Sequence, residues 1–315
     1  MKLFADRELV WLIGGILVFL SIATVVAAIL RRRATSESAR ATVDNLVART
    51  RAWWVMVFVF GVAIATGGIG SLVMFAIVSF LALREFMTLL PTRRADHRAM
   101  LWTFFLFLPL QYWYVATGWY GMFSLLIPVY AYLLLPSVLV LAGDTEDFLS
   151  RTSRLQWVLM ICVFCVSHAP ALLMLDIPGY EGEGAKLLLF LVVVTQVSDV
   201  LQYVVGKLFG RRKAVPTVSP NKTIEGYLGG GGLAVLIGTA LWWATPFTPW
   251  QAALLSLVVV LAGMAGGLVM SAVKRDRHVK DFGALIPGHG GVLDRIDSLC
   301  FSAPLFFHLT RFYFT

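Results

Sequence analysis

The chain alternates between long apolar runs and short polar stretches that are rich in arginine and lysine. A transmembrane helix needs roughly 20 mostly apolar residues, so the apolar runs are compared with that length. The runs predict membrane spans near residues 9–30, 53–69, 71–90, 100–118, 121–143, 155–176, 187–206, 226–246, 250–273 and 298–313. We therefore predict an all-α, polytopic integral membrane protein with nine or ten transmembrane helices.

The polar stretches between the spans are too short to form a separate soluble domain, since the longest has about twenty residues. Residues 1–315 are therefore predicted to form one membrane domain, with N-terminal hydrophobic spans at 1–190 and the polar motifs at 191–315. The first apolar run is longer than the roughly 7 to 15 residues of a signal-peptide core, and it ends in three arginines. We expect it to be a retained span.

Composition supports a membrane location and argues against a nucleic-acid partner. Hydrophobic residues make up 59% of the 315 residues and charged residues 14%, with a mean hydropathy of +0.80, whereas soluble domains have about a quarter of their residues charged. The net charge of +8 comes from basic loops beside apolar spans. Such loops are typical of the cytoplasmic side, where they meet anionic lipid headgroups. Cys162 and Cys165 lie in an apolar run and are predicted to be buried thiols.

The distribution of positive residues predicts which loops share a side of the membrane. With ten spans and the N-terminus outside, the inward loops near 31–51, 93–98, 151–154, 207–222 and 274–295 contain most of the 26 lysines and arginines. The outward loop at 176–186 is net acidic. Because lysine and arginine accumulate on the cytoplasmic side, we expect the two most polar segments to face the cytosol.

The polar segment at 271–297 has the composition of a site for a phosphate-rich ligand and a divalent metal. It contains five cations, four carboxylates and a Gly-His-Gly-Gly turn. Asp294 and Asp297 are three residues apart, so they share a face if this part is helical, and a loop would bring in Asp281. Gly288, Gly290 and Gly291 would let the backbone approach phosphate. The alternative is a juxtamembrane basic loop whose acidic residues serve solubility.

The same segment resembles the signature of the phosphatidate cytidylyltransferase family at nearly every fixed position. The signature reads Ser, two residues, Lys-Arg, a variable stretch, Lys-Asp, then His-Gly-Gly, two residues, Asp-Arg, one residue, Asp. The matching residues here are Ser271, Lys274, Arg275, Lys280, Asp281, His289, Gly290, Gly291, Asp294, Arg295 and Asp297.

A second polar block lies upstream, at 198–226. Ser219 is predicted to cap a helix with Pro220 in its first turn, which would place Asn221, Lys222 and Thr223 at a helix N-terminus, an anion-binding position. This block is similar to the same family, which carries Asp and Tyr followed by Ser-Pro, one residue, Lys-Thr and Glu-Gly. The resemblance covers roughly residues 195–300.

One position departs from the family pattern. The family usually has a small residue directly before the tyrosine that aligns with Tyr203, and here that residue is Gln202. With Gln196, Ser198 and Asp199 it forms a polar stripe in an apolar span. Ionisable groups at membrane depth suggest a functional site, and a hydrogen-bonded helix contact is the structural alternative. We favour function for Asp199 and leave Gln202 open.

The resemblance implies an enzyme that makes CDP-diacylglycerol and pyrophosphate from CTP and phosphatidic acid in phospholipid biosynthesis. It also implies a bacterial inner membrane, with the active site facing the cytoplasm. The oligomeric state is left open between a monomer and a homodimer. We assign Mg²⁺ to Asp281, Asp294 and Asp297, with Asp199 as a further carboxylate, and we add Lys280 and His289 to the catalytic group. Substrate contacts are assigned to Ser219, Asn221, Lys222, Thr223, Lys274, Arg275, Gly290, Gly291, Arg295, Asp199, Gln202 and Tyr203.

Three other functions are compatible with this pattern. They are a CTP-dependent polyprenol kinase, a cytidylyltransferase that acts on another lipid phosphate, and a non-catalytic transporter or scaffold. Outside the two polar blocks, His168 beside Pro170 is predicted to be a contact within the helix bundle. The adjacent Arg84 and Glu85 are predicted to form an interfacial pair at the end of their span.

Overall fold

The computed structural model describes residues 7–33, 36–286, 288 and 290–315, and most of them are helical. Six helices are long and continuous: α1 (Arg7–Arg33), α2 (Glu37–Ala65), α3 (Gly67–Thr88), α10 (Gly184–Phe209), α12 (Pro249–Asp276) and α13 (Leu293–Phe314).

Three further spans are built from shorter helices joined by π-helical turns. They are Arg94–Ala116, with α4 (His97–Trp102) and α5 (Leu108–Ala116); Tyr120–Val140, with α6 (Tyr120–Leu125) and α7 (Tyr132–Val140); and Phe148–Met174, with α8 (Phe148–Leu159) and α9 (Val166–Ala171). The apolar segment Gly226–Ala240 ends in α11 (Gly231–Ala240).

The prediction of an all-α polytopic membrane protein is confirmed. Eight helical segments among the described residues are long and apolar enough to cross a membrane. The other two predicted spans appear as the shorter apolar helix Gly226–Ala240 and as α13, which lies outside those eight. The largest shift in a boundary is at α2, which begins at Glu37 rather than near 53, because its polar first half continues the helix beyond the apolar run.

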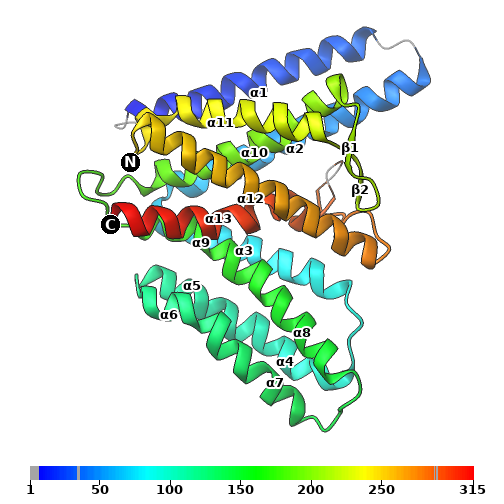
Figure 1. Cartoon of the computed structure of the whole chain (residues 1–315), viewed down its shortest axis with the longest axis vertical. Helices are drawn as coiled ribbons and strands as arrows, with labels where there is room; N and C mark the ends of the chain where they lie inside the picture. The colour runs from blue at the N-terminus through cyan, green and yellow to red at the C-terminus, as the bar shows by residue number, and fades with distance from the viewer. Residues whose placement is uncertain (1–6, 34–35, 287, 289) are drawn as a thin grey trace.

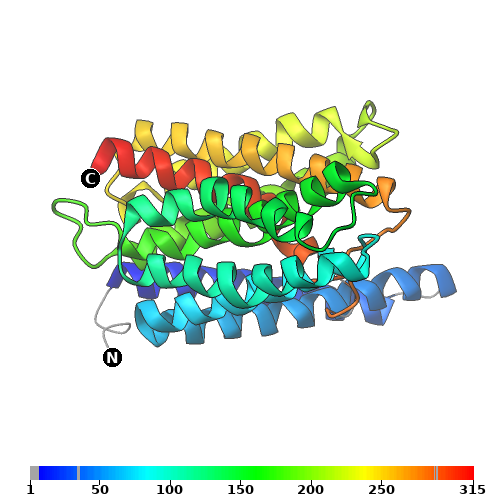
Figure 2. The same ribbon diagram turned by 90° about the horizontal axis from the view of Figure 1, so that it is seen from below.

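The helices run side by side, so that their connections gather at two ends of the molecule. The start of α1 and the end of α13 lie at one end, and the end of α1, the start of α2 and the turns α3–α4 and α7–α8 lie at the other end, where α12 also ends (Figure 1). Figure 2 shows α2 and α3 along one face, with α11 and α12 along the opposite face. The loops that were predicted to face the cytosol therefore share one end of the bundle.

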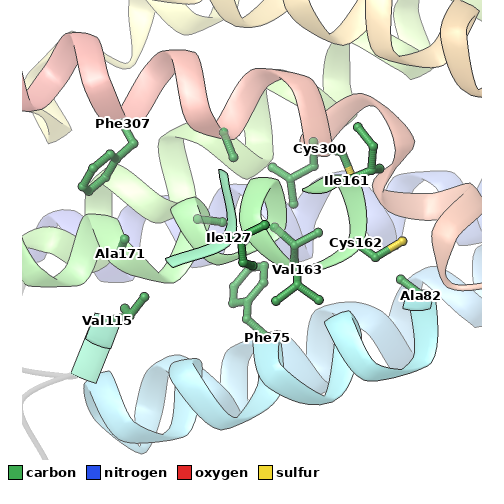
Figure 3. Close-up of a cluster of buried hydrophobic side chains, with 14 of the residues drawn as sticks. Phe75, Ala82, Val115, Ile127, Ile161, Cys162, Val163, Ala171, Cys300 and Phe307 are labelled. Carbon is green, nitrogen blue, oxygen red and sulfur yellow. The ribbon is translucent and has the colours of Figure 1, made fainter. Parts of the chain in front are cut away.

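The hydrophobic core lies between α3, the span Phe148–Met174 and α13. Phe75 of α3, Val163 and Phe307 of α13 are among its side chains (Figure 3). Cys162 is a fully buried free thiol in this core, as predicted, whereas Cys165 is a free thiol that is only half-buried. The core therefore joins the N-terminal spans to the C-terminal helix.

Close packing of α12 against α13 depends on small residues. A Cβ at Gly266 would lie 2.7 Å from the Asp297 carbonyl oxygen, and a Cβ at Gly263 would lie 3.4 Å from Ser298 Cβ. Without side chains at these positions the two helix backbones approach each other, as in small-residue contacts between membrane helices. This contact brings the middle of α12 beside the first turns of α13.

The prediction of a helix N-terminus at Ser219 is wrong. Residues Lys213–Val215 (β1) and Ser219–Thr223 (β2) form an antiparallel hairpin, in which Val215 pairs with Ser219 and Lys213 with Thr223. A proline is tolerated in such an edge strand, where its missing N–H is not needed. The helix begins after β2, and Thr223 Oγ1 accepts a hydrogen bond from the Gly226 N–H at 3.1 Å.

Candidate active site

Two carboxylates from distant parts of the sequence meet where α10 contacts α13. Ser298 Oγ donates to Asp199 Oδ1 at 3.1 Å, and the Ser298 N–H donates to Asp297 Oδ1 at 2.8 Å. Ser298 is buried, and both carboxylates are half-buried. Two acidic groups held this close in an apolar bundle are stabilised in their ionised form by cations or a metal ion nearby.

The hairpin supplies one of these cations. Lys222 extends from β2 toward α12, where a Cβ at Gly267 would lie 2.7 Å from its Nζ. The Lys222 ammonium interacts electrostatically with both Asp199 and Asp297, and it lies 5.6 Å from the centre of the Tyr227 ring. Lys222 is therefore part of the carboxylate cluster. It is positioned by strand β2 and not, as predicted, by a helix N-terminus.

Arg295 is the second cation of the cluster. Its charge interacts with Asp297, Asp294 and Asp199, but also with the like charge of Arg49 on α2. The Arg295 Nε and the Tyr227 hydroxyl are buried and have no hydrogen-bond partner within the described part of the chain. Buried donors without partners are uncommon in folded proteins. These two groups are therefore available to a ligand that enters the cluster.

Asp294 has a different environment. Its Oδ1 accepts from Lys274 Nζ at 2.9 Å, and its Oδ2 accepts from the Phe282 and Gly291 N–H groups at 2.8 and 2.9 Å. The Asp294 side chain is only 2% exposed. Its contacts thus fix the end of α12 and both ends of the loop at 282–291 relative to α13. Lys274, predicted to bind phosphate, serves in this structure as the partner of Asp294.

Gly290 lets the loop turn tightly beside these carboxylates. Its φ is +81°, a conformation that favours glycine, and a Cβ there would lie 2.8 Å from Asp294 Oδ2 and 3.0 Å from Asp281 Cβ. The loop therefore brings Asp281, which is exposed, to the same glycine as Asp294. Lys280 is exposed too. His289, assigned above to the catalytic group, lies outside the described residues.

The predicted magnesium ligands do not form a ready-made metal site. Among the residues that the structure describes, no three His, Cys, Asp or Glu side chains are grouped so that they could hold a metal ion. Asp294 is used by the loop, whereas Asp199 and Asp297 converge on Ser298. A pair of carboxylates fits Mg²⁺, which commonly binds through one or two carboxylates together with substrate phosphates. The assignment of Mg²⁺ to Asp281, Asp294 and Asp297 stays a prediction.

The hairpin itself is fixed at the end of the bundle by polar contacts. Arg275 Nε donates to the Val218 carbonyl oxygen at 3.3 Å. The Arg211 and Arg212 N–H groups donate to the Glu225 carboxylate, and these backbone donors lower the pKa of Glu225. Ser219 is half-buried in β2, and Asn221 is exposed. Arg275 thus contacts the hairpin in this structure, and its assignment to substrate stays a prediction.

Gln202 and Tyr203 lie at the edge of the cluster. Gln202 Nε2 donates to Ser198 Oγ at 2.6 Å, one helical turn away. A Cβ at Gly230 would lie 2.4 Å from the Gln202 backbone N, so Gln202 also lies at a close helix contact. The Tyr203 ring is 55% exposed, with Arg49 and Lys207 at 5.8 and 5.9 Å from its centre. Both the structural and the functional interpretation of Gln202 remain compatible with this geometry.

One residue of the site was not found from the sequence. Glu85 at the end of α3 accepts hydrogen bonds from the Val292 and Leu293 N–H groups, both at 2.9 Å. Its predicted role, an interfacial pair with Arg84, is replaced by a contact with the N-terminus of α13. The only signal for Glu85 in the sequence is that it is an acidic residue near the end of a span. Nothing in the local sequence indicates a partner about 200 residues away.

Comparison with known proteins agrees with this geometry. Residues 47–313 match the Cytidylyltransferase family. The chain belongs to this family. The matched region includes Glu85 and the complete carboxylate cluster, so it extends well beyond the two blocks that carried the resemblance in sequence. Cytidylyltransferases are nucleotidyltransferases, and the family implies CTP and a lipid phosphate as substrates.

Individual relatives cover different shares of the chain. A protein of Escherichia coli (strain K12), described as "Uncharacterized protein YnbB", is 43% identical over 268 residues, which are 84% of this chain and 87% of that protein. The phosphatidate cytidylyltransferase of Mycobacterium leprae is 47% identical over 126 residues, 39% of this chain and 40% of that enzyme. That of Staphylococcus aureus (strain COL) is 39% identical over 127 residues, 40% and 49% of the two chains.

Proposed function

We propose that the protein is a phosphatidate cytidylyltransferase, which converts CTP and phosphatidic acid into CDP-diacylglycerol and pyrophosphate. The observation that carries the proposal is the cluster of Asp199, Asp297, Lys222 and Arg295 around Ser298, inside the region that matches the family. The named enzymes among the relatives align with only about 40% of this chain, so the lipid acceptor is the part that needs a direct test.

In the proposed reaction, an oxygen of the lipid phosphate attacks the α-phosphorus of CTP. A new P–O bond forms between lipid phosphate and the cytidylyl group, the bond between the α-phosphorus and its bridging oxygen breaks, and pyrophosphate leaves with the electron pair. The nucleophile is already an anion, so no general base is required. The protein has to hold two anionic substrates in line and neutralise them.

Lys222 and Arg295 are suited to this task because each lies beside carboxylates without being fully paired by them. The unpartnered Arg295 Nε and Tyr227 hydroxyl would donate to phosphate oxygens. Asp199 and Asp297 would hold Mg²⁺ jointly with the phosphates of CTP, with Asp294 one turn away on α13. The ion would neutralise the charge that develops on the leaving pyrophosphate.

The direct test is product analysis with purified protein, labelled CTP, Mg²⁺ and a panel of lipid phosphates and lipid alcohols. A cytidylyltransferase moves the label into lipid and releases pyrophosphate, with the highest turnover expected on phosphatidic acid. Release of CDP with a phosphorylated lipid would instead identify a kinase, and label in a different CDP-lipid would identify another acceptor. Absence of CTP binding and turnover with every lipid would contradict the proposal as a whole.

We further propose that the end of the bundle with the hairpin faces the cytosol of a bacterial inner membrane. CTP is a cytosolic substrate, and most of the basic loops lie at this end. Single cysteines at Lys213→Cys or Arg277→Cys should be protected from an impermeant thiol reagent in intact cells, whereas Glu181→Cys should react. Equal labelling at all three positions would contradict this orientation.

A further inference from the structure

Glu85 contacts the N-terminus of α13, the helix that carries Asp294, Arg295 and Asp297. Its two carboxylate oxygens accept separately, Oε1 from the Val292 N–H and Oε2 from the Leu293 N–H, each at 2.9 Å. Val292 directly precedes α13 and Leu293 is its first residue, so the helix provides no carbonyl partner for these N–H groups. Asp294 follows immediately. A residue of α3 thus sets where α13 begins.

The space around Glu85 is shaped for a carboxylate. A Cβ at Gly283 would lie 2.7 Å from Glu85 Oε1, and a Cβ at Gly291 would lie 2.3 Å from Oε2. Both glycines belong to the loop between α12 and α13. The loop can close over the carboxylate only because these two positions lack side chains.

The next residue of α3 makes an independent contact with the same loop. The Phe86 ring centre lies 5.2 Å from that of Phe282, and Phe86 is also in edge contact with Trp157 at 5.6 Å. Phe282 is buried, and its N–H donates to Asp294. Glu85 and Phe86 together therefore connect α3 to both ends of the loop that holds Asp294.

We propose that Glu85 is a positioning residue for cytidylyl transfer, which holds the start of α13 so that Asp294, Arg295 and Asp297 keep their places in the cluster. This inference rests on the proposed function. It gives the N-terminal half of the chain a defined part in the active site. Glu85 touches backbone rather than substrate, so its effect passes through the geometry of α13.

The variant Glu85→Gln tests this role with little change of shape. Both carboxylate oxygens accept from N–H groups, so the amide NH₂ of glutamine would face one of these donors and lose that hydrogen bond. We expect kcat to fall by about 10- to 100-fold, since a displacement of about 1 Å can cost about 100-fold in rate. The KM for CTP should change much less. The kinetic assays should be run well below the unfolding temperature of the variant, so that unfolding does not lower the measured kcat.

Two further variants separate positioning from general damage. Arg84→Gln changes the exposed neighbour on α3 and should leave turnover unchanged. Gly283→Ala displaces the Glu85 carboxylate from the loop side and should lower kcat in the same way, and it serves if Glu85→Gln fails to fold. Glu85→Gln and Gly283→Ala disturb the same contact of the Glu85 side chain, so their effects on kcat in the double variant should be less than additive.

Hydrogen–deuterium exchange gives a readout that does not depend on catalysis. The peptide that contains Val292 and Leu293 should exchange faster in Glu85→Gln than in the wild type, with α12 unchanged. Unaltered exchange there, or equal loss of turnover in Arg84→Gln and Glu85→Gln, would overturn the positioning role. Failure of the wild type to use CTP would instead contradict the proposed function. The exchange result would then still show whether Glu85 protects the N–H groups of Val292 and Leu293.

Discussion

Two arginines near the same end of the bundle, Arg151 and Arg295, show how differently a buried cation can be used. Arg151 of α8 has a side chain that is 3% exposed, and each of its guanidinium nitrogens lies within 3.2 Å of an acceptor. Its partners are the Asp96 and Asp144 carboxylates and the carbonyl oxygens of Asp144 and Glu146. Arg295 of α13 has three carboxylates nearby, but its Nε has no hydrogen-bond partner among the described residues, and Arg49 adds a like charge.

The difference separates architecture from a binding site. A buried arginine that lies at ion-pair distance from two carboxylates leaves little demand for another anion, and breaking those pairs leaves an uncompensated charge. A cation without such close pairs among the described residues, and with a like charge beside it, is suited to an additional anion. Charge alone therefore does not identify the site in this protein. The two regions differ in the close ion pairs of Arg151 with Asp96 and Asp144, at 2.8 and 3.1 Å.

Arg151→Gln should break the first region and leave the second intact. Removing one partner of a buried ion pair costs about 3 to 5 kcal/mol of folding free energy. We expect a large drop in the thermal unfolding midpoint in detergent, while folded protein keeps its turnover per molecule. Loss of turnover without loss of stability would contradict the assignment of Arg151 to architecture.

Arg295→Gln should have the opposite signature. Losing one group that stabilises developing charge costs about 100- to 1,000-fold in kcat, or about 2.7 to 4 kcal/mol. The unfolding midpoint should change little, because the Arg295 Nε makes no hydrogen bond to the residues that the structure describes. Steady-state kinetics and thermal unfolding of the same preparation provide the check. A variant that is unstable yet fully active when folded would show that Arg295 belongs with Arg151.

Gln202→Ala tests the edge of the site, where the lipid headgroup is expected. Gln202 and Asp199 are three residues apart on α10, and Gln202 donates to Ser198. Buried polar groups left without partners cost about 1 to 3 kcal/mol. We expect the ranking of phosphatidic acid against other lipid phosphates to change by about 10- to 100-fold in kcat/KM, with a smaller change in the KM for CTP. Weaker use of CTP with unchanged ranking would assign Gln202 to the nucleotide side or to helix packing.

Much of the fold could be predicted from the sequence, because membrane spans depend on local hydropathy. Every predicted span lies within or overlaps a helix, and His168 beside Pro170 is fully buried among aromatic rings as a contact of the bundle. The hairpin was missed because Ser219 and Pro220 form a plausible cap on their own. The pairing of β2 with β1 depends on residues upstream that carry no strong strand pattern.

The site was predictable only in part, for a related reason. Asp294 and Asp297 share a helical face because of their spacing, but the contact of Asp297 and Asp199 through Ser298 joins residues about 100 positions apart. Glu85 reaches α13 from α3. Such contacts follow from helix packing, which the hydropathy of single spans does not specify. The positive charge of Lys274 alone did not indicate that it donates a hydrogen bond to Asp294.

The smallest expected effect concerns the exposed edge of the Arg151 region, where Arg93 contacts Asp144 and Glu146. The Glu146 backbone N–H and the arginine charges lower the pKa of Asp144, and the hydrogen bond from Arg93 lowers the pKa of Glu146. A lowered pKa in the folded state contributes stability above the ordinary value of about 4, and this contribution is lost as the pH falls through the lowered pKa.

The wild type should therefore unfold at a higher temperature than Arg93→Gln at pH 7, and the gap should narrow as the pH falls below about 4. The gap should be small, because Glu146 is exposed, Arg93 and Asp144 are half-buried, and ion pairs open to solvent stabilise little. Thermal unfolding of both proteins across this pH range measures it, with exposed Arg94→Gln as the matched control. A gap that stays constant between pH 7 and pH 3 would mean that Arg93 stabilises the protein through packing. In that case the exposed edge would contribute nothing to the charge pairing that holds Arg151 in place.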